Sequence, residues 1–65
     1  MYDKLLLEAR NAHRARTGHG HIFVGQNFVE CLQCRKHAHL TSDGMRLEVH
    51  DANHKCVETI DAKDF

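Results

Sequence analysis

Two cysteines separated by two residues, Cys31 and Cys34, limit the folds open to this chain more than any other feature of its sequence. Such a pair sets two thiolates on one side of a tight turn, where they form half of a metal site. A thioredoxin-like redox pair would need a βαβ context that this sequence lacks. Burial as two small apolar residues would leave the spacing unexplained. We therefore expect the pair to bind a metal ion.

The length of the chain makes additional stabilisation valuable. Its 65 residues form one domain at most, which we place at 1–65. A domain of this size buries only about 60% of the surface that its unfolded chain exposes. The sequence also has just one Tyr, three Phe and no Trp to build a core. A bound metal is one of the usual means by which so small a domain becomes stable.

The cysteine count and the hydropathy pattern point to a reducing compartment. Three cysteines cannot all pair in disulfides within one chain. The apolar run Leu5–Leu7 is too short for a secretory signal, and no run approaches the roughly 20 apolar residues that cross a bilayer. We therefore expect a cytoplasmic protein with free thiols and no membrane partner.

Residues 2–17 are predicted to form a helix. Apolar positions recur every three or four residues and continue to a histidine. This face consists of Tyr2, Leu5, Leu6, Ala9, Ala12 and His13. Gly18 can end the helix in a left-handed conformation. The apolar face could also join two copies of the chain in a homodimer, and we interpret His13 as a partly covered surface residue rather than a ligand.

A β-hairpin is predicted next. Residues 22–24 and 28–31 are short runs rich in β-branched and aromatic residues, separated by three residues that include Gly25. The second run leads into the cysteine pair. Residues 35–40 alternate in polarity and suit a third strand, and residues 41–44 form a break rich in turn formers.

The segment after this break has two readings. Residues 45–50 alternate apolar and polar side chains after Asp43-Gly44, as expected for a strand in a hairpin. An apolar stripe with helical spacing also begins at Met45 and extends to Ile60. We favour the helix because its stripe is longer, and we expect residues 61–65 to be frayed. The predicted fold is thus a small α+β zinc-stabilised domain. It has an N-terminal helix, a short antiparallel hairpin or three-stranded sheet with the zinc knuckle, and a C-terminal helix.

The second half of the metal site should come from His50, His54 and Cys56. Structural zinc sites take four ligands, commonly as two pairs close in sequence. On a helix, His50 and His54 differ by only about 40° around the axis, whereas Cys56 lies about 200° beyond His54. Either the two histidines complete the site with Cys31 and Cys34, or the helix ends early and Cys56 replaces His54.

These residues resemble a known family, the two-cysteine, two-histidine zinc finger with β-β-α architecture. The resemblance rests on Val29-x-Cys31-x2-Cys34 followed by Leu47-x2-His50-x3-His54. It implies bound Zn²⁺, a ββα-like unit over residues 21–60, and nucleic-acid binding. The spacer between the pairs has 15 residues, where the family has about 12. Ala38 stands where the family has an aromatic residue, and Cys56 offers an alternative closure.

A closed four-ligand site has no open position for a substrate, so we expect no enzymatic activity. Two binding functions remain. Residues 1–40 carry six basic and three acidic residues, and residues 41–65 carry three basic and six acidic ones. The zero net charge and the acidic C-terminal half favour a protein-interaction adaptor or regulator. The alternative is a nucleic-acid-binding protein, for which phosphate contacts need basic side chains. The candidates are Arg10, Arg14, Arg16, Arg35, Lys36 and Arg46.

Overall fold

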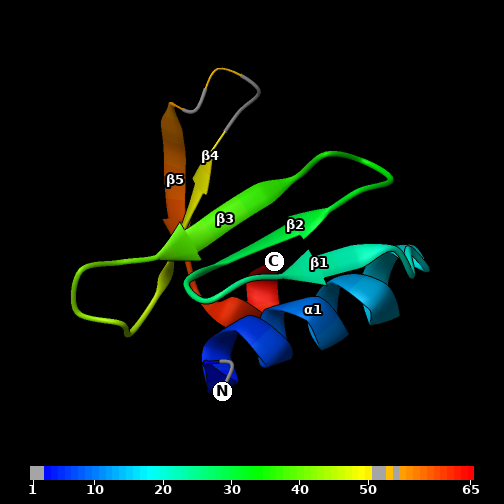
Figure 1. The fold of residues 1–65 in the computed structure, drawn as a ribbon, viewed down its shortest axis with the longest axis horizontal. Helices are drawn as coiled ribbons and strands as arrows, with labels where there is room; N and C mark the ends of the chain where they lie inside the picture. Colours follow the sequence, from blue (N-terminus) through cyan, green and yellow to red (C-terminus); the bar gives the residue numbers. More distant parts are fainter. Residues whose placement is uncertain (1–2, 51–52, 54) are drawn as a thin grey trace.

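The computed structural model describes residues 3–50, 53 and 55–65 (Figure 1). One helix precedes a five-stranded antiparallel sheet in which each strand pairs with the next along the chain. The helix α1 spans Lys4–Thr17. The strands are β1 (Ile22–Val24), β2 (Phe28–Cys31), β3 (His37–Leu40), β4 (Leu47–His50) and β5 (Cys56–Ile60). A 3₁₀ turn, η1 (Ala62–Asp64), follows the last strand.

The helix forms as the sequence predicts. The Asp3 side chain caps its start by accepting a hydrogen bond of 2.8 Å from the Leu5 backbone N–H. Gly18 ends it at a φ of 79°, in the left-handed region that glycine adopts without steric cost. Leu6, Ala9 and His13 are its buried residues. No helix in the described part of the chain is both long enough and apolar enough to cross a membrane.

The prediction of a C-terminal helix is wrong. The strands β4 and β5 occupy the range of that expected helix. Among the described residues, η1 is the only helical turn after the sheet. The alternating pattern decides the outcome, because it buries Leu47 and Val49 on the face of the sheet that packs on α1. The longer apolar stripe is not buried as a unit, since Met45 is 71% exposed and Cys56 is also exposed. The sheet therefore has five strands instead of three, and the chain does not adopt the ββα architecture.

The core lies between α1 and the inner face of the sheet. Its members are small or medium in size except for one aromatic ring. The buried cluster is Leu6, Ala9, Val29, Ala38, Leu47, Val49, Ala62 and Phe65. The helix face that we considered for a homodimer thus contributes Leu6 and Ala9 to the chain's own core.

The C-terminal segment is part of this core, so the expectation that it is frayed is wrong. Phe65 is fully buried, and η1 lies beside α1 (Figure 1). Arg16 holds η1 against α1, because its guanidinium donates hydrogen bonds of 2.9 and 2.8 Å to the main-chain oxygens of Asp64 and Lys63. The side of α1 that faces η1 is therefore fixed against the end of the described chain.

Candidate metal centre

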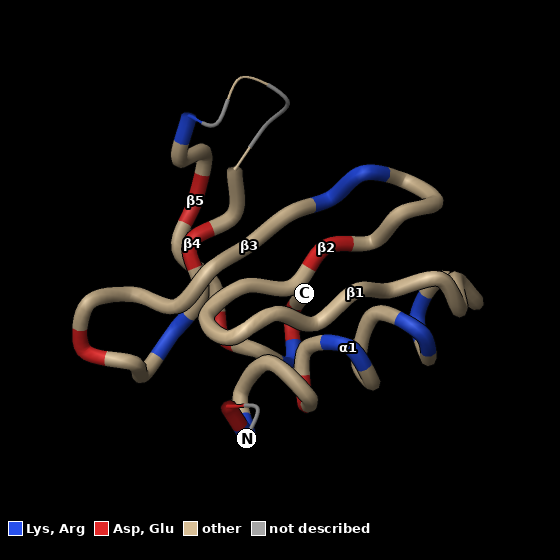
Figure 2. Tube along the Cα trace, in the orientation of Figure 1, with Lys and Arg blue, Asp and Glu red and all other residues tan. Residues whose placement is uncertain are grey.

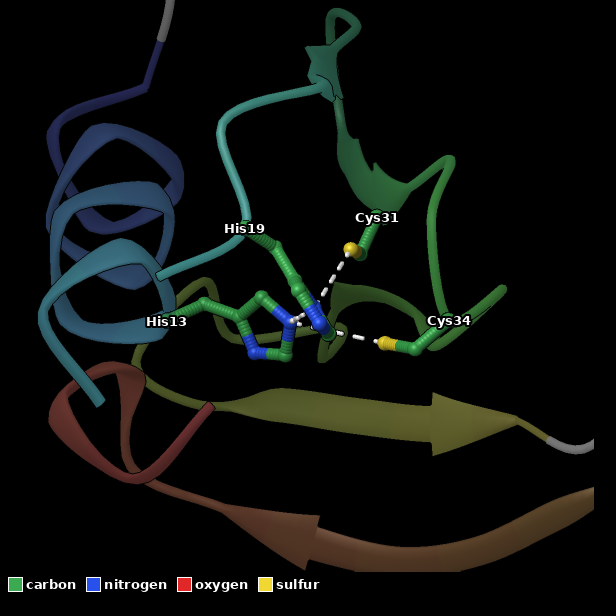
Figure 3. Close-up of side chains that lie close together, drawn as sticks. All are labelled: His13, His19, Cys31 and Cys34. Atoms are coloured by element: carbon green, nitrogen blue, oxygen red, sulfur yellow. Dashed lines mark hydrogen bonds between the residues drawn. The ribbon is translucent and has the colours of Figure 1, made fainter. Parts of the chain in front are cut away.

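Four metal-binding side chains from three parts of the chain point toward one another (Figure 3). His13 comes from α1 and His19 from the segment between α1 and β1. Cys31 ends β2, and Cys34 lies in the turn that follows. One ligand atom from each residue lies within 4.8 Å of all the others. The structure therefore contains a group of two histidines and two cysteines that can hold a metal ion.

The distances within this group fit a tetrahedral ion. His13 Nε2 lies 3.4 Å from His19 Nδ1. The Cys31 Sγ atom is 3.4 Å from His19 Nδ1, and the Cys34 Sγ atom is 3.5 Å from His13 Nε2. Bonds of about 2.0 Å to nitrogen and about 2.3 Å to sulfur at tetrahedral angles place two nitrogens about 3.3 Å apart, and a nitrogen and a sulfur about 3.5 Å apart. The observed spacings match both values.

The other ring nitrogen of His13 fixes the orientation of its imidazole. Nδ1 lies 3.1 Å from the main-chain oxygen of Phe65. That oxygen can only accept, so Nδ1 carries the hydrogen and Nε2 presents its lone pair to the group. The ring is buried and packs against the Phe65 ring, with the two centroids 5.1 Å apart. A histidine ligand held through its second nitrogen by an oxygen acceptor is the usual arrangement at protein metal sites.

The backbone around His19 is held by three local features. Gly18 turns the chain out of α1. The Thr17 hydroxyl accepts a hydrogen bond of 3.1 Å from the His19 N–H. The Gln33 side-chain oxygen accepts from the backbone N–H groups of Gly20 and His21, at 2.8 and 3.1 Å. Because Gln33 lies between the two cysteines, it ties the His19 segment directly to the knuckle.

The knuckle itself is a tight turn. The Arg35 N–H donates to the Cys31 carbonyl at 2.7 Å, and the Cys31 N–H donates to the Lys36 carbonyl at 2.8 Å. Arg35 closes the turn at a φ of 67°, in the left-handed region. Burial raises the pKa of the Cys31 thiol, but hydrogen bonds from the backbone of Cys34 and Gln33 bring this pKa below its ordinary value. The turn therefore favours the thiolate, which is the form that binds metals.

The structure brings together only part of the ligand set predicted from the sequence. Cys31 and Cys34 lie in one group as expected. His50 lies on β4 in a different group, with His39 and Glu48. Cys56 is exposed on β5, where it pairs with His50 across the two strands. His54 falls outside the described residues.

Two members of the group, His13 and His19, are not among the ligands predicted from the sequence. The sequence predicts a partly covered surface position for His13, yet this residue is only 3% exposed. A signal was present, because His13 continues the apolar face of the helix, and a polar residue on such a face needs a buried partner. His19 gives a weaker signal, since its position depends on the turn that Gly18 makes.

Most of the basic residues proposed for nucleic-acid binding make contacts within the chain. These contacts join Arg10 to Asn11, Arg16 to Lys63 and Asp64, Arg35 to Glu30, Lys36 to Phe65, and Arg46 to Asp61. Arg14 is exposed on α1. Basic residues lie on the second half of α1 and in the knuckle, whereas β4 and β5 carry the acidic residues Glu48 and Glu58 (Figure 2).

Comparison of the chain with protein-family models, with curated proteins and with solved structures gives no match.

Proposed function

We propose that His13, His19, Cys31 and Cys34 bind one Zn²⁺ ion and that this ion has a structural role. The observation that supports the proposal is the spacing of the four ligand atoms, because both kinds of distance agree with a tetrahedral ion. Two thiolates also balance the charge of a divalent cation, so the closed site carries no net charge into a partly buried position. Zinc suits this mixed nitrogen and sulfur donor set.

The small hydrophobic core explains why a bound ion would be needed for stability. Phe65 is the only aromatic side chain among the fully buried residues that the structure describes. Structural zinc contributes about 10–16 kcal/mol in zinc-finger peptides, which is as large as the whole folding free energy of a typical domain. The ion would join α1, the segment after it and the knuckle at one point. Loss of zinc should therefore loosen the helix from the sheet.

We further propose that this zinc-held domain acts without catalysis, as a protein-interaction adaptor or regulator. Four protein ligands leave no coordination position for a substrate. Four large apolar side chains are exposed and thus open to contact by a protein partner: Phe23, Leu32, Met45 and Val57. The intramolecular contacts of most basic candidates also favour a protein partner over a nucleic acid.

Nucleic-acid binding is the second candidate. The metal group sets the knuckle, with Arg35 and Lys36, beside the end of α1 that carries Arg14 and Arg16. A basic surface assembled in this way could contact a phosphate backbone. The observation that favours it is the gathering of basic residues at that end of the fold (Figure 2).

The zinc proposal is tested by native mass spectrometry before and after chelation, together with the absorption spectrum of the cobalt-substituted protein. We expect one zinc per chain in the closed site, a large drop in melting temperature on its removal, and a cobalt–thiolate charge-transfer band. Cys34→Ser should weaken this band. The matched control Cys56→Ser should leave it unchanged, because Cys56 lies on β5 outside the group. A chain that binds no zinc at low free-metal concentration, yet stays folded, would refute the proposal.

The two binding functions are separated by retention on heparin or duplex DNA at increasing salt. Phosphate contacts would give binding that falls steeply with salt and weakens in Arg14→Ala. The protein-adaptor proposal predicts no retention at low salt, and identical behaviour of Arg14→Ala and the wild type. Strong salt-dependent retention that Arg14→Ala reduces would favour the alternative.

A further inference from the structure

We propose that His39, Glu48 and His50 form a second metal site, separate from the four-ligand group, that takes a divalent transition-metal ion. These three side chains lie on the outer face of the sheet, and their ligand atoms lie within 4.8 Å of one another. With only three protein ligands, such a site keeps at least one coordination position open to water or to a ligand from another molecule.

Strand pairing explains why the three residues meet. β3 and β4 are antiparallel neighbours in which His39 lies directly opposite Glu48. His50 is two residues beyond Glu48 and therefore points to the same face. On the opposite face, Ala38 and Val49 are directly paired and belong to the core under α1. The register that buries the core thus also gathers the two imidazoles and the carboxylate on the outer side.

The Glu48 carboxylate lies close to the Nε2 atoms of both histidines. One Glu48 oxygen, Oε2, lies 3.4 Å from His39 Nε2 and 3.9 Å from His50 Nε2. The side chains of His39 and Glu48 are 36% and 34% exposed, whereas that of His50 is 12% exposed. An ion can therefore reach the group from solvent through His39 and Glu48, while His50 forms the deeper side of the site.

The rings of His39 and His50 are stacked, with centroids 4.2 Å apart and planes 26° apart. An ion lies near the plane of each imidazole that binds it, and two stacked planes do not meet at a suitable distance. Binding therefore requires one ring to turn about its Cβ–Cγ bond. His39 is the more exposed of the two and has the space to do so. This reorientation makes the second site weaker than the preformed four-ligand group.

The donor set and the local charge define the ion. Two imidazoles and one carboxylate suit Zn²⁺, Ni²⁺, Co²⁺ or Cu²⁺, and the absence of a thiolate from the set lowers its preference for softer ions. Glu30 lies on the same face, 3.9 Å from His37, and adds negative charge beside the group.

The test uses the full chain preloaded with one equivalent of Zn²⁺, checked by native mass spectrometry, and then titrated with Ni²⁺ by calorimetry. Zinc held by the two thiolates keeps the first site filled, so heat from added Ni²⁺ reports the second site alone. We expect one further equivalent of Ni²⁺ and paramagnetic broadening of NMR signals from His39, Glu48 and His50. No Ni²⁺ binding to the zinc-loaded protein would overturn the proposal.

Two matched variants test the ligand set. Glu48→Gln should weaken Ni²⁺ binding by about tenfold or more, since even the outer-shell partners of metal ligands contribute 10- to 100-fold. Glu30→Gln neutralises a half-buried glutamate beside a histidine on the same face without removing a ligand, so it should weaken Ni²⁺ binding far less than Glu48→Gln does. An equal loss in both variants would overturn the assignment. His39→Asn provides a second ligand variant, and the cobalt–thiolate band of the first site verifies folding in each. Failure of the first site would appear separately, as loss of that band and of the preloaded zinc.

Discussion

The Nε2 atom of His13 lies 3.5 Å from the Sγ atom of Cys34, across 21 positions of sequence. This contact joins α1 to the knuckle after β2. The opposite nitrogen of the same imidazole binds the main-chain oxygen of Phe65. One side chain therefore connects the helix, the knuckle and the C-terminal turn, and any ion bound by His13 and Cys34 would act on all three.

Replacing His13 by glutamine removes one ligand from the group, and we expect a loss of zinc affinity greater than the roughly 10- to 100-fold caused by losing an outer-shell partner. Competition with a chromophoric chelator measures the change. His21→Gln is the matched control, because His21 is an exposed histidine two residues after His19 and lies outside the group. Equal affinities for the two variants would show that His13 is not a ligand.

Gln33 acts as a positioning residue for His19. Gln33→Ala removes the oxygen that accepts hydrogen bonds from Gly20 and His21. Each bond contributes about 1 kcal/mol, so we expect zinc affinity to fall by up to about 30-fold. Gln33→Glu keeps an acceptor oxygen and should restore most of the affinity. If Gln33→Glu were as weak as Gln33→Ala, the two hydrogen bonds would not explain the effect.

Phe65 should contribute strongly to folding. It is fully buried and its ring packs at a tilt against that of His13, and truncation of a buried Phe to Ala costs about 3–5 kcal/mol. Denaturant unfolding of zinc-loaded Phe65→Ala should show a loss of this size. Phe23→Ala, at a position that is 53% exposed, should change the unfolding free energy by at most about 1 kcal/mol. Similar losses in both variants would contradict the placement of the C-terminal segment.

Zinc affinity should fall as the pH is lowered. Protons and the metal ion compete for the same sulfur atoms, so affinity rises with pH until the pH exceeds the thiol pKa and is level above it. The pKa of Cys31 lies below its ordinary value of 9.0, so competition at this sulfur begins at a lower pH than for a free cysteine. Cys56→Ser should give the same curve as the wild type. An affinity that stays constant from neutral pH down to about pH 5 would argue against thiolate ligands.

Much of the fold follows from local sequence patterns. The spacing of Leu6 and Ala9 predicts the buried face of α1, and Gly18 marks its end. The hairpin of β1 and β2 and the cysteine turn after it also lie where the sequence places them. These elements could be predicted because each is specified by residues close together in the chain.

Two features could not be predicted from the sequence, because each depends on contacts between distant segments of the chain. The segment containing Leu47 and Val49 fits either a strand or a helix, and pairing with β3 decides for the strand. The ligand set is likewise not specified by local sequence, because His13 approaches Cys34 only when α1 packs on the sheet. The resemblance to a zinc finger predicts histidine ligands after the cysteines, whereas the group in the structure uses histidines that precede them.

NMR of the cadmium-loaded protein tests the central claim most directly, since scalar coupling between the metal nucleus and nearby protons identifies each ligand. We predict one cadmium signal at the tightly bound site, coupled to the β-protons of Cys31 and Cys34 and to ring protons of His13 and His19. Coupling of that signal to His50, His54 or Cys56 would contradict the account and would return the site to the arrangement expected from sequence.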